Sequence, residues 1–303
     1  MRFRRSLVGI DVNAIGMVFA AISRERSSFR LSGARQESLD GVFDFSSKRP
    51  NILDSRRFTE AVRRGMDLLA SKEERVALSL PDRVGRLYLT ELEMPFKSHQ
   101  EGVDIIKWRL KSSLPAEPGQ VKLDFQMMGK REDGRHRCLA SAIALPVLEQ
   151  YEGLLGEAGL QAVLIDFHSL NLYNYYRSRM ELSDEFLLLG LEAGRMIVQY
   201  FSGGALAYQR VREGSLERKK LFLELNRTLT EARSSCPAIM RCAVYVHLDS
   251  DLDEETAALL SACFEREVKI LDPQFRRLPG SAAAISLPSG AMAAAIAAAE
   301  RLI

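Results

Sequence analysis

The 303-residue sequence lacks an excess of charge of either sign and has only four cysteines. Its 42 lysines and arginines nearly balance 40 aspartates and glutamates, so no overall field attracts a polynucleotide or an anionic membrane. We therefore expect no nucleic-acid partner. Because no two cysteines form a CxxC pair, the sequence argues against both a zinc site and a disulfide framework. Reduced thiols and a cytoplasmic location are predicted.

Long apolar runs are missing as well. The basic N-terminus begins like a signal peptide, but Asp11 and Asn13 soon interrupt the apolar stretch that follows. The alanine-rich segment 282–303 is broken by Pro288 and Gly290. The remaining stretch of about fourteen residues is shorter than the roughly twenty that a membrane span needs. We expect no membrane-inserted segment.

The sequence does contain an order of elements that occurs twice, in a chain long enough for about two domains. Apolar runs, turn signals and helical periodicity predict three strands, a helix and a fourth strand, and then the same order again. The first set covers 7–12, 17–22, 29–34, 58–69 and 76–80, and the second covers 186–191, 196–201, 205–211, 221–232 and 243–248. This repetition of a βββαβ unit predicts a two-lobed α/β fold of the actin-like, ribonuclease H-like group.

The segments between these sets predict the domain organisation. Ser98 and Glu101 form a capping box that predicts the start of a helix in the middle of the chain. Asp166 is expected to cap a later helix. The predicted parts are a first lobe (subdomain 1A, 1–81), an inserted small α+β subdomain like 1C (82–165), a connecting helix (166–184), a second lobe (185–285) and a C-terminal helix that returns to the first lobe (286–303).

Several short motifs follow one another in an order that resembles a known family. The stretch from Val8 to Val12 fits that family's first strand. The most specific part lies in the predicted insertion, where Trp108, the Leu114-Pro115 step and the strand 121–125 follow in turn. The chain thereby resembles the PilM family, actin-like cytoplasmic proteins of type IV pilus assembly that are related to the cytoplasmic part of type II secretion L proteins. The resemblance implies the same two-lobed fold.

The resemblance also implies a nucleotide site, formed by two Asp-bearing hairpins and a glycine turn. In the first hairpin Asp11 stands at the family's Asp, while Asn13 replaces a glycine and can still adopt a positive φ. In the second hairpin Gly190 stands at the Asp position, and Glu192 lies two residues further on the same strand face. The third element is replaced by the acidic loop 249–253. We expect Asp11, Asn13 and Glu192 to be vestigial, with no catalytic residue, no bound metal and neither ATP nor Mg²⁺ as cofactor.

Two further constellations have competing interpretations. Asp249, Asp251 and Asp253 begin like a calcium loop, but position six is Glu254 rather than glycine, which favours a helix N-terminus with acidic caps. His168 could form an acid–base pair with Asp166, two residues earlier. No nucleophile motif lies close to it, so a position at the start of a helix is favoured.

The resemblance implies a non-enzymatic scaffold that binds the N-terminal cytoplasmic tail of a bitopic, PilN-like inner-membrane protein and contacts the pilus motor ATPase. The protein would be held at the inner membrane by these partners, as a monomer or a homodimer. Trp108, Leu114 and Phe125 are candidates for the partner groove, although core packing is the favoured role of each.

Two other functions stay open at this point. The chain could be a PilM-type actin-like ATPase in which Asp11 and Glu192 organise Mg²⁺ and nucleotide controls lobe closure. A sugar or acetate kinase on the same fold would need a catalytic carboxylate and a nucleotide-binding glycine loop. The sequence offers neither.

Overall fold

The computed structural model describes residues 6–25, 28–69, 71–93, 96–130, 133–177, 179–180, 183–192, 194–214, 217–273, 276–277 and 287–303. Residue contacts divide the chain into two compact units, which we describe separately. The first contains Met1–Tyr175, Phe275–Leu287 and Met292–Ile303, and the second contains Tyr176–Gln274 and Pro288–Ala291.

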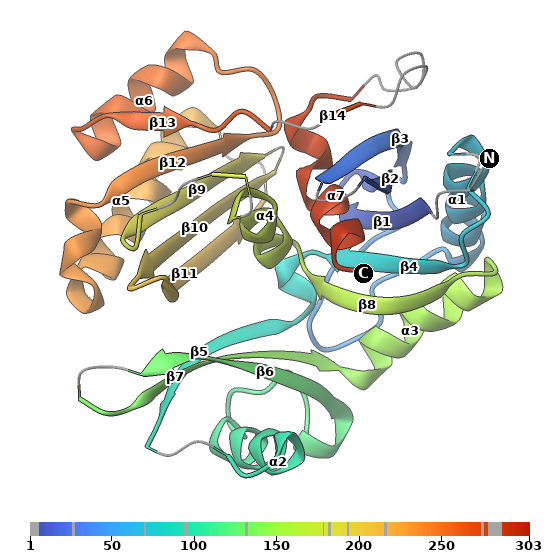
Figure 1. The fold of residues 1–303 in the computed structure, drawn as a ribbon, viewed down its shortest axis with the longest axis horizontal. Coiled ribbons are helices and arrows are strands. Elements are labelled where there is room, and N and C mark those ends of the chain that lie inside the picture. Colours follow the sequence, from blue (N-terminus) through green and yellow to red (C-terminus); the bar gives the residue numbers. More distant parts are fainter. Residues whose placement is uncertain are drawn as a thin grey trace. The chain divides into compact units, whose positions relative to one another are not determined.

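The first unit is built on a six-stranded sheet with the order β14-β3-β2-β1-β4-β8 (Figure 1). Strands β1, β2 and β3 are antiparallel neighbours. Strand β4 pairs in parallel with β1, and β8 pairs in parallel with β4. The elements of this layer are β1 (Ser6–Asn13), β2 (Gly16–Glu25), β3 (Ser28–Ser38), α1 (Ser55–Leu68), β4 (Arg75–Leu80), α3 (Leu145–Glu157), β8 (Gln161–Phe167) and β14 (Arg276–Arg277).

Helix α1 forms where the sequence pattern predicts an amphipathic helix. The Asp54 side chain accepts a hydrogen bond from the backbone N–H of Arg57 and caps the helix. Phe58, Val62 and their apolar neighbours on the stripe are buried against the sheet, and each large apolar side chain buried in this way contributes about 1.5–3 kcal/mol. Tyr151 of α3 packs edge-on against Phe58, with ring centroids 6.3 Å apart. Both helices therefore cover the same face of the sheet.

The opposite face of the sheet is covered by helix α7 (Ala293–Glu300). Side chains alternate along β1, so Val8 faces the α1 core while Gly9 faces α7. A Cβ atom at Gly9 would lie 1.9 Å from the backbone oxygen of Ala295. This close approach requires glycine on the strand and small residues on the helix, which is the physical reason for an alanine-rich α7 rather than a membrane segment. Among the described helices, none is both long and apolar enough to cross a membrane.

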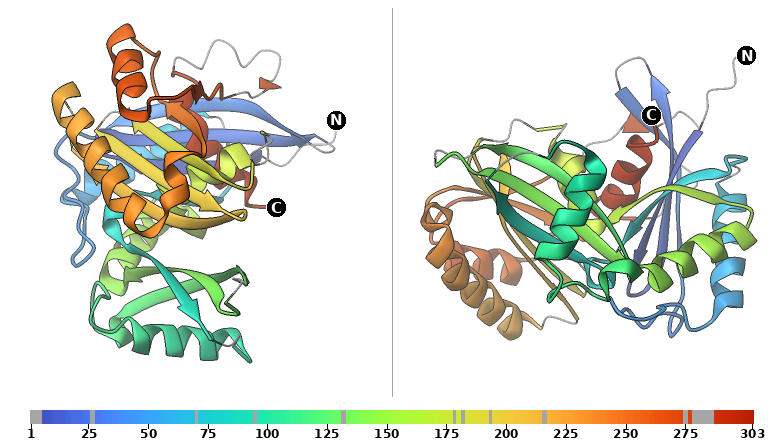
Figure 2. Two further views of the ribbon diagram at one scale, coloured as in Figure 1. Left: turned by 90° about the vertical axis from the view of Figure 1, so that its left-hand side faces the viewer. Right: turned by 90° about the horizontal axis from the view of Figure 1, so that it is seen from below.

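A small α+β subdomain is inserted after β4. Its antiparallel sheet has the order β5-β7-β6, and one face is covered by α2 (Figure 2). The predicted helix start is confirmed with Ser98 as its N-cap, because Ser98 Oγ accepts from the N–H of Glu101 at 3.1 Å. The Glu101 carboxylate accepts from the N–H of Lys97 at 2.7 Å rather than from that of Ser98, so the reciprocal bond of a capping box is replaced by one to the preceding residue. The elements are η1 (Asp82–Val84), β5 (Arg86–Leu92), α2 (His99–Arg109), η2 (Pro118–Gln120), β6 (Val121–Lys130) and β7 (His136–Ala144).

The second unit repeats the order of three strands, helix and strand, as the sequence predicted. Its sheet has the order β11-β10-β9-β12-β13, and the leucines of α5 are buried in its core. The boundary between the units falls inside α4. The remaining elements are α4 (His168–Arg177), β9 (Phe186–Glu192), β10 (Arg195–Ser202), β11 (Ala205–Glu213), α5 (Arg218–Ser235), η3 (Pro237–Met240), β12 (Ala243–Leu248), α6 (Glu254–Phe264), β13 (Val268–Ile270) and η5 (Gly290–Met292).

Candidate functional site

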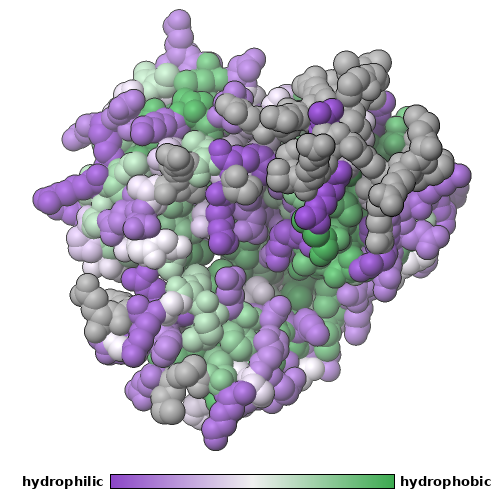
Figure 3. Space-filling model, viewed as in Figure 1, coloured by the Kyte–Doolittle hydropathy of each residue, from purple (hydrophilic) through white to green (hydrophobic). Residues whose placement is uncertain are grey.

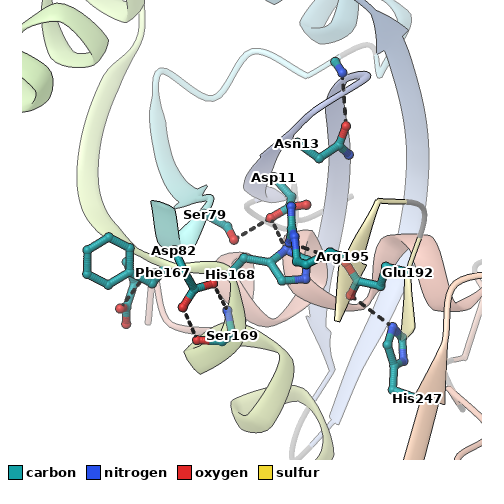
Figure 4. A network of polar contacts seen from close by, with 12 residues as sticks. Asp11, Asn13, Ser79, Asp82, Phe167, His168, Ser169, Glu192, Arg195 and His247 are labelled. Atoms are coloured by element: carbon teal, nitrogen blue, oxygen red, sulfur yellow. Dashed lines mark hydrogen bonds and ion pairs between the residues drawn. The ribbon is translucent and has the colours of Figure 1, made fainter. Parts of the chain in front are cut away.

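The turn of the first hairpin is closed by its own side chain. Asn13, at the end of β1, accepts hydrogen bonds at its Oδ1 atom from the backbone N–H groups of Ile15 and Gly16, both at 3.0 Å (Figure 4). This is an Asx turn, in which a side-chain oxygen satisfies the turn donors. Asn13 does not adopt the positive φ that the sequence allowed. Gly16 takes the unusual conformation instead, with φ 152°.

The carboxylate of Asp11 is buried and hydrogen-bonded to two side chains from other elements. Its Oδ1 atom accepts from Ser79 Oγ at 2.5 Å and lies 2.8 Å from His168 Nδ1. The strand register explains why these side chains meet. Asp11 of β1 pairs with Ser79 of β4, and Ser79 pairs with Asp166 of β8, which lies two residues before His168. Figure 4 shows Ser79 and His168 both pointing at the Asp11 carboxylate.

The polarity of this cluster follows from its donors. Asp11 is 2% exposed and His168 is 4% exposed, so a charged carboxylate here must be compensated by its neighbours. An ionised carboxylate only accepts hydrogen bonds, hence Nδ1 of His168 carries the proton that it donates. The single hydroxyl proton of Ser79 also goes to the carboxylate. In nucleophilic catalysis serine donates to the imidazole, so this arrangement is a charge-stabilising cluster rather than a catalytic triad.

A second carboxylate fixes the start of α4 and thereby His168. Asp82 of η1 accepts from the backbone N–H of Ser169 at 3.1 Å and also from the Ser169 hydroxyl. The expectation that Asp166 caps this helix is wrong: Asp166 lies within β8, where it accepts from the N–H of Phe167 and pairs with Arg301. His168 does begin α4, as favoured from the sequence.

In the second unit, the carboxylate of Glu192 lies between two nitrogen-bearing side chains. Its Oε2 atom is 3.4 Å from Nη1 of Arg195, and its Oε1 atom is 3.4 Å from Nε2 of His247. Arg195 is 5% exposed and His247 is fully buried. The other ring nitrogen of His247 lies 2.7 Å from the hydroxyl of Tyr176. The carboxylate of Glu192 is thus engaged by basic groups of the protein itself.

The acidic loop after β12 is the N-terminus of α6. Asp253 caps this helix by accepting from the N–H of Thr256 at 2.7 Å, and it also pairs with Arg218 at 3.1 Å. These donors, the Thr256 N–H first, lower the pKa of Asp253 below its usual value. Across the described residues, no three His, Cys, Asp or Glu side chains are grouped to hold a metal ion. The helix-cap interpretation is confirmed.

A groove of about 320 Å³ lies on the inserted sheet, on the face away from α2. Odd-numbered residues of β6 such as Leu123 pack under α2, whereas Lys122 and Asp124 line the groove. The Oδ1 atom of Asp124 also lies 2.9 Å from Nε2 of His99, the first residue of α2. Strand β8 and helix α3 form the other wall. The lining residues are Leu80, Lys122, Asp124, Ser141, Ile143, Leu148, Glu152, Ala162, Val163, Leu164, Ile165, Asp166 and Phe167. Figure 3 shows apolar residues on the surface over the inserted sheet, with hydrophilic residues around them.

The two strands beside the groove are both edge strands of their sheets. An edge strand presents backbone N–H and C=O groups to an additional strand. Val163 is the extra residue of a bulge in β8, and its side chain is 36% exposed. Of the three carboxylates in the lining, Asp166 pairs with Arg301 and Asp124 pairs with His99, whereas Glu152 is exposed on α3. The groove can therefore receive an extended peptide with apolar and basic side chains.

The three residues proposed for partner binding lie elsewhere. Trp108 is 79% exposed on α2, so the core packing favoured from the sequence is wrong for it. Leu114 and Phe125 are partly buried against the core between α2 and the sheet, and Phe125 stacks on His99 with ring centroids 4.9 Å apart. All three are separate from the described lining of the groove.

The groove residues of β6 were missed, although the sequence holds a signal for them. The alternation Val-Lys-Leu-Asp-Phe at 121–125 places two polar side chains on the face opposite the apolar ones. That pattern predicts a second, accessible face of the sheet. The facing wall on β8 lies 40 residues or so away in sequence, and no local pattern predicts that pairing.

No protein-family model matches this chain, and no curated protein matches it in sequence. Solved structures nevertheless define its class: it has an actin-like fold, as predicted. One similar structure, a protein from Bacteroides thetaiotaomicron described as having an actin-like ATPase fold, has a TM-score of 0.53 and 12% identity, covering 90% of this chain and 93% of that one.

Within this class the fold is PilM-like. The structure of a PilM–PilN type IV pilus biogenesis complex matches with a TM-score of 0.79 and 15% identity over 98% of both chains. The cytoplasmic domain of EpsL, an inner-membrane component of the type II secretion system of Vibrio cholerae, matches with a TM-score of 0.50 and 12% identity, covering 91% of this chain and 90% of that one. The resemblance seen in the sequence motifs is confirmed at the level of the fold.

Proposed function

We propose that the protein is a non-enzymatic scaffold of type IV pilus assembly, or of a related type II secretion machine, that binds the N-terminal cytoplasmic tail of a PilN-like inner-membrane protein. The observation that carries the proposal is the groove between β6 and β8, in a chain whose fold matches the PilM–PilN complex end to end. This partner would hold the protein at the cytoplasmic side of the inner membrane. Contact with the pilus motor ATPase is a further expectation.

The groove suggests how such a tail binds. An extended segment can add to the free edge of β6 or β8, so that backbone hydrogen bonds supply affinity. Alternate side chains would then point to the apolar lining, which includes Ile143, Leu164 and Phe167. A basic side chain of the tail would lie near the exposed carboxylate of Glu152. The proposed ligand is therefore an extended peptide that is apolar and carries at least one positive charge.

The loss of nucleotide chemistry is part of the same proposal, and the residues of the first hairpin do not fit a phosphate with Mg²⁺. The turn N–H groups that would bind phosphate already donate to Asn13. The Asp11 carboxylate, which would organise the ion's waters, is bonded to Ser79 and His168. In the second unit Glu192 is likewise beside Arg195. Binding of ATP would have to break contacts that the chain makes for itself.

Calorimetric titration of the full chain with two ligands tests both parts. A peptide that copies the tail of the neighbouring bitopic protein should bind, and ATP with Mg²⁺ should give no heat of binding. Micromolar ATP binding would return the protein to the actin-like ATPases, with nucleotide-controlled closure. Failure of the peptide to bind would refute the groove as the partner site.

A matched pair of charge variants on α3 locates the peptide. Glu152 lines the groove, whereas Glu149 is exposed on the same helix outside the described lining. Glu152→Lys should weaken peptide binding, because it reverses a charge beside the bound basic residue. Glu149→Lys makes the same change in net charge and should leave the affinity unaltered. Equal losses in both variants would show that only overall charge matters.

A further inference from the structure

Trp108 is an exposed aromatic residue that the groove does not use. It is the single tryptophan of the chain, it lies on α2, and 79% of its surface is open. Ile105, one turn earlier on the same side of the helix, is 42% exposed. Tryptophan is among the residues most enriched where proteins associate, because it buries a large apolar area with little loss of side-chain entropy. This helix face is therefore a candidate interface.

The surface next to Trp108 is hollowed. A cavity of about 670 Å³ is lined by apolar side chains that include Leu92, Phe96 and Ile105, with Trp108 at its border. A projecting indole and an adjoining apolar hollow on one surface are complementary to each other. They cannot be satisfied within one molecule, but a second copy of the same surface can satisfy both at once.

The charges along α2 indicate the orientation of that second copy. Glu101 and Asp104 lie in the first half of α2, whereas Lys107 and Arg109 lie in its last turn and Lys111 follows the helix. If two such helices pack antiparallel, the acidic end of each faces the basic end of the other. A parallel arrangement would place like charges opposite one another, which is unfavourable. The pattern is thus self-complementary only in the antiparallel sense.

The lining of the hollow also argues for a second copy rather than for a strongly charged partner. Its carboxylates belong to Glu91, Glu93 and Glu101, and they are matched in number by the cations of Lys97, Arg109 and Arg135. A surface that attracts nucleic acid or anionic lipid is dominated by cations. A surface with balanced charge can meet an identical surface without a net repulsion between the two copies.

We propose that the protein forms a two-fold symmetric homodimer in which α2 of one copy packs antiparallel on α2 of the other. Trp108 of each copy lies over Ile105 and the apolar hollow of its partner. The interface lies on the α2 side of the inserted sheet, and the peptide groove lies on the opposite face. Dimer formation therefore leaves the groove accessible, and the two proposals can fail independently.

The sole tryptophan gives a direct measurement. The full chain is diluted through a concentration series while sedimentation reports its mass and fluorescence reports Trp108. We expect a shift from monomer to dimer as concentration rises, with a blue shift of emission over the same range. Trp108→Ala should raise the dimer Kd by about 30-fold or more, the effect of a central interface residue. Because this side chain is exposed, the variant should fold like the original chain.

Three results would overturn the proposal. The first is a monomer at all concentrations up to about 0.5 mM, since any remaining affinity would then be negligible. The second is a dimer whose tryptophan emission does not shift, and the third is a dimer that Trp108→Ala leaves intact. Peptide binding to the groove is measured in parallel for Trp108→Ala, and it should be unaltered.

Charge reversal tests the antiparallel arrangement separately. Asp104→Lys removes the excess of negative charge at the first end of the face, and Lys111→Glu reduces the positive charge at the other end, so each variant alone should dimerise more weakly. An equimolar mixture of the two should restore association, because the introduced lysine of one copy then faces the introduced glutamate of the other. Glu149→Lys serves as a control with no expected effect. If the mixture associates no better than either variant alone, the antiparallel packing is wrong.

Discussion

The two hairpins that open the two repeats have the same order of strands, but their carboxylates differ in burial and in the contacts that they make. In the first unit Asp11 is 2% exposed, with partner atoms at 2.5 and 2.8 Å. In the second unit Glu192 retains about 12% side-chain exposure, and its carboxylate makes ionic contacts of 3.4 Å with Arg195 and with His247. The first carboxylate is tightly bonded by neutral and basic donors, whereas the second makes looser ionic contacts.

The difference shows two ways in which one scaffold stabilises an acidic group at a hairpin. A buried carboxylate costs several kcal/mol unless hydrogen bonds compensate its charge, which explains the close fit around Asp11. A longer side chain that reaches partial exposure needs less compensation, because water screens it. The first hairpin should therefore be sensitive to loss of a partner, and the second should be tolerant.

The largest expected effect is that of His168→Ala. This change removes the basic partner of a buried carboxylate, so we expect the free energy of unfolding to fall by about 3–5 kcal/mol. Urea denaturation followed by circular dichroism measures the loss. If the loss is below about 1 kcal/mol, the contact between Asp11 and His168 does not compensate a buried charge.

A double variant separates charge from packing. Asp11→Asn combined with His168→Gln removes both ionisable groups while retaining polar side chains of similar size. Because no uncompensated charge is then left in the interior, the double variant should be more stable than His168→Ala. A double variant that is less stable would show that the ionised pair itself contributes the stability.

A smaller loss is expected from Glu192→Gln in the second unit. The amide retains the shape of the side chain but removes its charge from beside Arg195 and His247. Since the distances are long and His247 keeps its contact with Tyr176, we expect a loss of about 1 kcal/mol. Denaturation under the same conditions as for His168→Ala makes the two values comparable. A loss as large as that of His168→Ala would remove the proposed difference between the hairpins.

The contrast between the hairpins could be predicted only in part. The repeated element order followed from apolar periodicity, because each helix stripe and strand run is local in sequence. The pairing of Asp11 with His168 was not predicted, since 157 residues separate them and only the registers of β1, β4 and β8 bring them together. The exposure of Trp108 was not predicted either, because an aromatic residue on a helix is more often part of a core.

A loss similar to that of Glu192→Gln is expected in the first hairpin from Asn13→Ala, which removes the acceptor for two turn N–H groups. Water can reach this turn, so the loss should be about 1 kcal/mol, typical of a partly exposed hydrogen-bonded side chain. Asn13→Asp retains an oxygen acceptor and is the matched control, with most of the stability preserved. Equal losses in both variants would mean that the Asx turn contributes little.

The smallest effect concerns the loops that follow the fourth strand of each repeat. After β4 the carboxylate of Asp82 binds the start of α4, and after β12 the carboxylate of Asp253 caps α6. The N–H of Thr256 and the guanidinium of Arg218 lower the pKa of Asp253 in the folded protein. The folded state therefore prefers the ionised carboxylate, and its contribution is present above the unfolded pKa of about 3.9.

That contribution is lost as the pH falls through the lowered folded pKa of Asp253. Asp253→Ala should reduce stability slightly at neutral pH, and the difference from the original chain should vanish in strong acid. Asp251→Ala, which changes an exposed carboxylate two residues earlier, should show no such convergence. Unfolding free energies measured between pH 2 and 6 test this, and a difference that grows toward low pH would show that the cap does not depend on the ionised form.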